Sequence, residues 1–133
     1  MGALIDASIL IAVERKQLDF DAVLAKHRDS DFALSAITAS ELLHGVHRAS
    51  SEAVKTRREA YVEALLASLP VIAFDLISAR VHARLSAKLS GKGAVIGAHD
   101  LLIASTALSR GMDVVTRDER SFPRIPGLTI VRW

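Results

Sequence analysis

Four acidic residues lie at positions from which a folded chain could gather them around one centre. They are Asp6, Glu41, Asp100 and Asp118. Carboxylates pressed together repel one another and resist ionisation, and a bound divalent cation removes that cost. Because hard oxygen ligands suit Mg²⁺ or Mn²⁺ better than zinc or copper, the four acids indicate a candidate metal site. An ion of this kind activates water and stabilises charge on a phosphoryl oxygen.

Each acid also has a purely structural interpretation. Asp6 could cap the helix that follows it, and Thr38 with Glu41 fits a Ser/Thr-x-x-Glu capping box, in which Glu41 bonds only to backbone. Asp100 could complement the dipole of the helix that it opens. Asp118 could stabilise a turn. Taken singly, these interpretations compete evenly with a chemical role, so spacing alone leaves both open.

The elements that must position these acids alternate along the chain. Short apolar runs predict buried strands at 3–5, 32–35, 71–74, 114–116 and 128–131. Helical patterns lie between them, near 7–15, 19–27, 38–49, 52–68, 76–90 and 100–110. This alternation predicts an α/β fold with a mainly parallel sheet covered on both faces, where ligands bind beyond the carboxyl ends of the strands. Asp6, Glu41 and Asp118 each follow a predicted strand, so the chain could bring them to one edge.

Two of the predicted helices carry packing signals. The apolar positions of helix 76–90 recur every four residues, at Ile77, Val81, Leu85 and Leu89. One stripe of that helix is therefore expected to face the core. Helix 100–110 is apolar nearly all round, which indicates burial, and Gly111 stands where a helix C-terminal glycine belongs.

The composition fits a single domain over residues 1–133. Half of the 133 residues are hydrophobic and none is cysteine, so a core can form but a disulfide or thiolate zinc site cannot. A net charge of +2, from 17 basic and 15 acidic side chains, does not by itself identify a nucleic-acid binder. The apolar segment after Asp6 is too short to span a membrane, and no cleavage pattern follows it. We therefore expect a cytoplasmic protein that does not associate with membranes.

Four motifs occur in order from one end of the chain to the other. They are Leu4–Ser8 (LIDAS), Ser40–Gly45 (SELLHG) with Arg48 shortly after it, Ile96–Ala104 (IGAHDLLIA), and Val115–Phe122 (VTRDERSF) followed by Ile125–Leu128 (IPGL). In order and spacing they resemble the PIN-domain ribonucleases, and most closely the VapC-type toxins of bacterial and archaeal toxin–antitoxin pairs. One such motif would be weak evidence, whereas four together in a chain of this length form a specific signal.

The resemblance implies a PIN-like three-layer α/β/α sandwich with a five-stranded, mainly parallel sheet. It also implies an endoribonuclease that depends on Mg²⁺ or Mn²⁺. Asp6, Glu41 and Asp100 fall on the three acidic metal-site positions of the family. Asp118 falls on a fourth position, which in relatives is Asp or Asn, so its contribution is less defined.

The implied reaction is hydrolysis of an RNA phosphodiester by metal-activated water, leaving a 5′-phosphate and a 3′-hydroxyl. Ser8 and Thr116 fall on polar positions that border the site, and one of them would hold a metal-bound water. Arg48 or Arg117 could neutralise a phosphate.

The resemblance further implies a small VapB-like antitoxin that inhibits the enzyme, and commonly a homodimer. Carboxylates at the entrance of the site attract a cationic side chain, so we expect this partner to insert an arginine or lysine near Asp6 and Asp100. Its apolar helix is expected to pack on the helices near 7–15 or 38–68.

Three other interpretations are weaker. A zinc or nickel site from Glu41, His44 and His47 is disfavoured because its outer members lie too far around a helix to chelate one ion easily. A phosphoacceptor domain also binds magnesium at strand ends, but Asp6 lacks a second acid beside it and no suitable lysine follows Lys92. The third is a PIN fold that has lost catalysis and only binds RNA or a partner, against which the intact acids argue.

Overall fold

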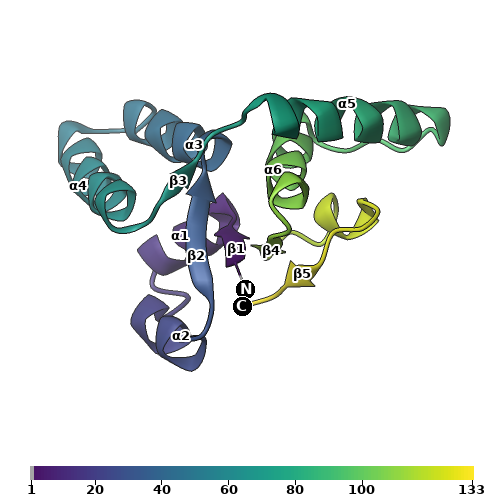
Figure 1. The fold of residues 1–133 in the computed structure, drawn as a ribbon. Helices are drawn as coiled ribbons and strands as arrows, with labels where there is room; N and C mark the ends of the chain where they lie inside the picture. The colour runs from purple at the N-terminus through teal and green to yellow at the C-terminus, as the bar shows by residue number, and fades with distance from the viewer. Residues whose placement is uncertain (1) are drawn as a thin grey trace.

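The computed structural model describes residues 2–133 and consists of a five-stranded sheet between two layers of helices (Figure 1). The strands are β1 (Gly2–Ile5), β2 (Asp31–Ser35), β3 (Val71–Ile72), β4 (Asp113–Val115) and β5 (Ile130–Val131). Their order across the sheet is β3-β2-β1-β4-β5, and every neighbouring pair is parallel. The predicted α/β/α fold is thus confirmed. Met1, with which the predicted domain begins, lies outside the described residues.

The helices divide between the two faces of the sheet (Figure 1). They are α1 (Ala7–Glu14), α2 (Phe20–Lys26), α3 (Ala36–His47), α4 (Glu52–Ser68), α5 (Leu76–Gly91) and α6 (Ala98–Ser109), with a short 3₁₀ turn at Phe122–Arg124. The first four cover one face, and α5 and α6 cover the other. None of the helices within residues 2–133 is long and apolar enough to cross a membrane.

Strand β1 lies at the centre and is buried on both sides. Ala3 and Ile5 belong to the core beneath α1, α3 and α4, whereas Leu4 packs into the opposite core with Ile103 and Ala104 of α6. Because side chains alternate along a strand, a strand covered on both faces reads as one continuous apolar run. The sequence Ala-Leu-Ile before Asp6 follows from that requirement.

Two helices begin two residues earlier than predicted, which changes the positions of Glu41 and Asp100 within them. Helix α3 begins at Ala36, because the hydroxyl of Ser35 accepts a hydrogen bond from the backbone nitrogen of Thr38 at 2.9 Å and caps the helix. The proposed capping box of Thr38 with Glu41 therefore does not exist, and Glu41 lies in the second turn. Helix α6 begins at Ala98, which leaves Asp100 within the first turn rather than at the start.

The expected apolar stripe of α5 is only half right. Leu85 and Leu89 are buried, but Ile77 is 61% exposed. Residues spaced by four drift about 40° per step around a helix of 3.6 residues per turn, so the stripe turns away from the core over its length. The predicted stop at Gly111 is confirmed, since this residue follows α6 with φ at +64°, a conformation that favours glycine.

Candidate active site at the carboxyl edge of the sheet

Three neighbouring strands end at the same edge and deliver the predicted acids to it. Asp6 directly follows β1, and its backbone nitrogen donates to the carbonyl of Val115 at the end of β4 at 2.8 Å. Glu41 comes from α3, after β2, and Asp118 lies just beyond β4. Asp100, in the first turn of α6, lies in the same region, where the negative charges of Asp6 and Asp118 contribute to raising the pKa of its carboxyl group.

Asp6 is buried and held by hydroxyl groups. Its Oδ2 accepts hydrogen bonds from Ser8 Oγ at 2.7 Å and from Thr116 Oγ1 at 2.9 Å. The Thr116 oxygen in turn accepts from the backbone nitrogen of Asp118 at 2.9 Å, and the Ser8 oxygen accepts from that of Arg117 at 3.0 Å. The two polar residues predicted to border the site therefore orient the carboxylate of Asp6.

Glu41 is half-buried and only partly satisfied. Its Oε2 lies 3.5 Å from Nδ1 of His99, while its Oε1 is buried and has no hydrogen-bond partner within residues 2–133. Burial raises the pKa of the Glu41 carboxyl group, and the negative charge of Asp6 raises it further. A buried carboxylate oxygen without a partner is unfavourable, and a cation would remove both the desolvation and the repulsion.

Asp100 has a similar environment. Burial raises the pKa of its carboxyl group, the charges of Asp6 and Asp118 add to the increase, and a hydrogen bond from Ser121 opposes it. The backbone at Gly97 approaches this carboxylate so closely that a Cβ there would lie 3.1 Å from Asp100 Oδ2. Gly97 thus makes room for Asp100 at the start of α6.

The acids are coupled through their charges but do not stand in coordination geometry. In the part of the chain that the structure describes, no three His, Asp or Glu side chains are close enough to hold one ion as they are placed. The zinc or nickel site from Glu41, His44 and His47 therefore does not form. Each acid instead forms a hydrogen bond or ion pair with a nearby protein group. The predicted turn-stabilising bond of Asp118 is present, since its Oδ1 accepts a hydrogen bond from the backbone nitrogen of Arg120 at 2.7 Å. The all-oxygen donor set and the unpartnered Glu41 atom nevertheless fit Mg²⁺ or Mn²⁺.

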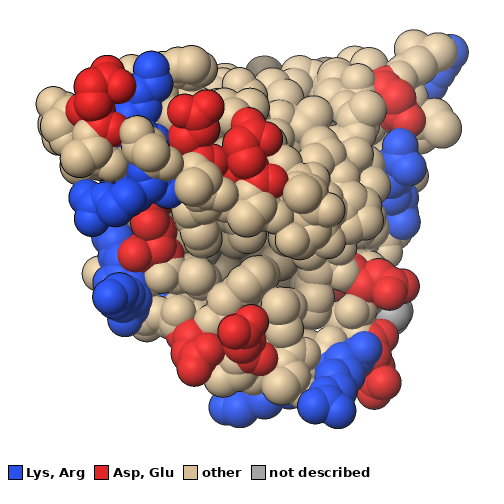
Figure 2. Space-filling model, turned by 90° about the vertical axis from the view of Figure 1, so that its left-hand side faces the viewer, with Lys and Arg blue, Asp and Glu red and all other residues tan. Residues whose placement is uncertain are grey.

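Within residues 2–133, neither of the two arginines considered for phosphate binding bonds to one of the four acids through its guanidinium. Arg48 is the exposed residue at the C-terminal end of α3, roughly 10 Å along the helix from Glu41. The guanidinium of Arg117 donates to the carbonyl of Trp133 at 3.0 Å. On the α4 side of the molecule, acidic and basic side chains are interspersed (Figure 2). Uniform positive charge therefore does not mark that face for RNA.

Sequence reasoning missed two residues that contact the acids, His99 and Ser121. His99 approaches Glu41 only because α3 and α6 pack together, and no local pattern signals that packing. Ser121 was inside the fourth motif, but nothing in its neighbours indicated a bond to Asp100.

Comparisons with known proteins identify the family to which the chain belongs. The sequence model of the PIN domain matches residues 3–128. The chain is 32% identical over 131 residues to ribonuclease VapC1 of Rickettsia felis, with 98% of this chain and 96% of that protein covered. It is 38% identical over 104 residues to the tRNA(fMet)-specific endonuclease VapC of Salmonella typhimurium, with 78% and 76% covered. A chain in the crystal structure of VapBC2 from Rickettsia felis bound to a DNA fragment from their promoter superposes with a TM-score of 0.90, at 27% identity over 100% of this chain and 99% of that one.

Proposed function

The chain belongs to the PIN-domain family, among its VapC-type ribonucleases, and we propose that its catalysis depends on Mg²⁺ or Mn²⁺ held by Asp6, Glu41, Asp100 and Asp118. It is an endoribonuclease, the toxin of a toxin–antitoxin module. The observation that carries the metal proposal is the buried, unpartnered Oε1 of Glu41, beside the charges of Asp6 and Asp100.

The residues around the acids have distinct tasks in this proposal. Ser8 and Thr116 fix the orientation of the Asp6 carboxylate through their two hydroxyl hydrogen bonds. Burial and the neighbouring negative charges disfavour the ionised forms of Glu41 and Asp100, and a bound cation would stabilise those forms. When bound, the cation supplies Lewis-acid stabilisation of phosphoryl charge and lowers the pKa of a water molecule. The products would carry a 5′-phosphate and a 3′-hydroxyl. Phosphate binding by Arg48 or Arg117 remains a prediction.

A VapB-like antitoxin is the partner of this toxin, as in the VapBC complexes with which the chain shares its fold. We propose that the antitoxin inserts a cationic side chain near Asp6 and Asp100 and packs an apolar helix on α1 or on α3 and α4. Ile11 of α1 is 39% exposed and offers apolar surface for such contact. We also propose that the toxin forms a homodimer and acts in the cytoplasm.

End-group analysis tests the chemistry. Initiator tRNA is the first substrate to try, because the Salmonella relative is named a tRNA(fMet)-specific endonuclease. Cleavage should stop in EDTA, return with Mg²⁺ or Mn²⁺, and leave 5′-phosphate ends. Glu41→Gln should abolish it, whereas Glu63→Gln, an exposed acid on α4, should not. Products with 2′,3′-cyclic phosphates formed in EDTA would refute the metal proposal, and RNA binding without cleavage would favour a catalytically silent PIN module.

A further inference from the structure

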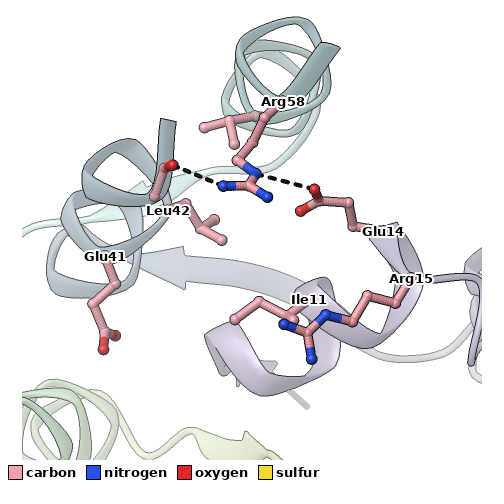
Figure 3. Close-up of a pocket in the computed structure, with 8 residues that line it drawn as sticks. Ile11, Glu14, Arg15, Glu41, Leu42 and Arg58 are labelled. Atoms are coloured by element: carbon pink, nitrogen blue, oxygen red, sulfur yellow. Dashed lines mark hydrogen bonds and ion pairs between the residues drawn. The ribbon is translucent and has the colours of Figure 1, made fainter. Parts of the chain in front are cut away.

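A hollow between α1, α3 and α4 is bordered at one end by Glu41, and its other lining residues have no part in the chemistry described above (Figure 3). Its volume is about 150 Å³, and its apolar walls are formed by Ile11, Leu42 and Val62. Charged groups from two helices complete it. Arg58 reaches down from α4 to Glu14, and Arg15, directly after α1, extends beside Ile11 (Figure 3).

Hydrogen bonds already hold Arg58 and Glu14 in place. Nε of Arg58 donates to Glu14 Oε1 at 3.1 Å, and its Nη1 donates to the carbonyl of Gly45 at 2.9 Å. The hydrogen bonds formed within residues 2–133 leave Glu14 Oε2 and the guanidinium of Arg15 available to a ligand. The hollow therefore combines apolar walls, a carboxylate acceptor and a cationic donor.

This hollow adjoins the candidate active site. A second hollow, which extends to His99 at the start of α6, shares Ile11, Glu41 and Leu42 with it. The two hollows therefore lie side by side at Glu41. An RNA strand with a phosphate at the acids would carry its neighbouring nucleotide towards them.

We propose that the hollow is a nucleobase subsite, which takes the unpaired base beside the scissile phosphate. The inference rests on the proposed ribonuclease function. Proteins read single-stranded RNA by placing splayed bases in slots and bonding their edges. Glu14 Oε2 would accept a hydrogen bond from the exocyclic amino group of adenine, cytosine or guanine, and Arg15 would donate to the backbone of that nucleotide. Uracil has no amino group and would be disfavoured.

The shape and charge of the hollow favour a base over a protein side chain. Its volume is below the roughly 300 Å³ at which pockets for drug-sized ligands begin, so it suits one ring system. An apolar side chain seated inside the hollow, as distinct from a helix packed over the exposed part of Ile11, would desolvate Glu14 and Arg15 without bonding to either. A base has apolar faces for the walls and polar edges for these two groups.

Short unstructured RNAs provide the test, once the cleavage position has been mapped. They would differ only at the two positions flanking the cut, which would carry an amino-bearing base, uracil or an abasic sugar. For the parent enzyme, kcat/KM should fall about tenfold with uracil or an abasic sugar at one of them, as expected for one lost hydrogen bond to a charged group.

Two variants test whether the hollow is responsible for the preference for an amino-bearing base over uracil or an abasic sugar. Glu14→Gln keeps an acceptor for Arg58 but presents both a donor and an acceptor to the base, so the preference for an amino group over uracil should nearly vanish. Ile11→Trp should fill the hollow at an exposed position and remove the difference between base and abasic sugar. Glu63→Gln, on the exposed side of α4, is the matched control and should discriminate like the parent.

Equal discrimination by the parent and both hollow variants would overturn the inference while leaving the ribonuclease proposal intact. So would variants that weaken inhibition by the antitoxin and leave base discrimination unchanged, because the hollow would then serve the protein partner. If the parent does not cleave at all, the ribonuclease proposal fails separately. Equilibrium binding of the same RNAs to the parent and to Glu14→Gln then decides the base preference.

Discussion

The hydroxyl group of Thr116 donates a 2.9 Å hydrogen bond to the carboxylate of Asp6, although 110 positions separate the two residues. The bond joins the ends of β4 and β1, which pair in parallel from Ala3 with Asp113 to Ile5 with Val115. The same hydroxyl oxygen accepts from the backbone of Asp118. One side chain therefore couples two of the four acids, and the geometry of the candidate site depends on the pairing of these strands.

Replacing Thr116 tests this coupling. Thr116→Val keeps the shape but removes a hydrogen bond to a buried carboxylate, and should lower the free energy of unfolding by about 2 kcal/mol. Mg²⁺ affinity should also fall roughly tenfold, since the orientation of Asp6 is lost. Urea unfolding in EDTA and calorimetric titration measure the two effects. Thr116→Ser retains the hydroxyl and should stay close to the parent, so equal losses in both variants would contradict the assignment.

Substitution of Asp100 separates a metal ligand from a helix-capping charge. If Asp100 only stabilised the start of α6, Asp100→Asn would cost a few tenths to about 1 kcal/mol. We expect instead that the variant in EDTA is at least as stable as the parent, because repulsion from Asp6 and Asp118 is relieved.

Mg²⁺ provides the second half of that comparison. At a hundredfold excess over its Kd it should stabilise the parent by about 2.7 kcal/mol and Asp100→Asn much less. Cleavage by the variant should fall by roughly a hundredfold or more. Thermal melting with EDTA and with Mg²⁺ measures the stabilisation. An active, destabilised Asp100→Asn that still gains the full stabilisation would exclude Asp100 from the site.

The raised pKa values of Glu41 and Asp100 predict a pH dependence of stability in the absence of metal. Both carboxyl groups hold a proton more tightly in the folded chain than in the unfolded chain. Between the ordinary pKa and the raised pKa the folded state therefore binds more protons, so the free energy of unfolding falls as pH rises through that window.

The difference between the parent and Glu41→Gln isolates this effect from the other titrating groups. Their free energies of unfolding in EDTA should diverge in favour of the variant from about pH 4 towards neutrality. Denaturant titrations at several pH values give the two curves. Parallel curves would mean that the folded chain does not raise the pKa of Glu41.

Gly97 offers a geometric perturbation that leaves every acid in place. A Cβ at this position would lie 3.1 Å from Asp100 Oδ2, so Gly97→Ala should displace the carboxylate by a few tenths of an ångström. We expect a clear loss of RNA cleavage and of Mg²⁺ affinity with little change in melting temperature. Gly91→Ala is the control, because no atom lies within 4 Å of its added Cβ and alanine favours the helix. Equal cleavage by the two variants would contradict the prediction.

Much of the fold and the acidic set could be read from local pattern. Apolar runs separated by amphipathic segments predicted a parallel sheet between helices, because a strand buried on both faces needs a continuous apolar run. The end of α6 at Gly111 followed from the conformational freedom of glycine. Motif spacing singled out Asp6, Glu41, Asp100 and Asp118, although their metal-binding role remains a proposal.

What the tertiary structure alone decided concerns contacts between distant segments. The strand order β3-β2-β1-β4-β5 and the bond from Thr116 to Asp6 depend on pairing that no window of sequence contains. The packing of α3 against α6 likewise placed His99 beside Glu41 and left one oxygen of Glu41 buried without a partner. Periodicity reports which face of an element is apolar, but the neighbour that covers the face is selected by the free energy of the whole packed chain. That selection determines which side chains meet at the edge of the sheet.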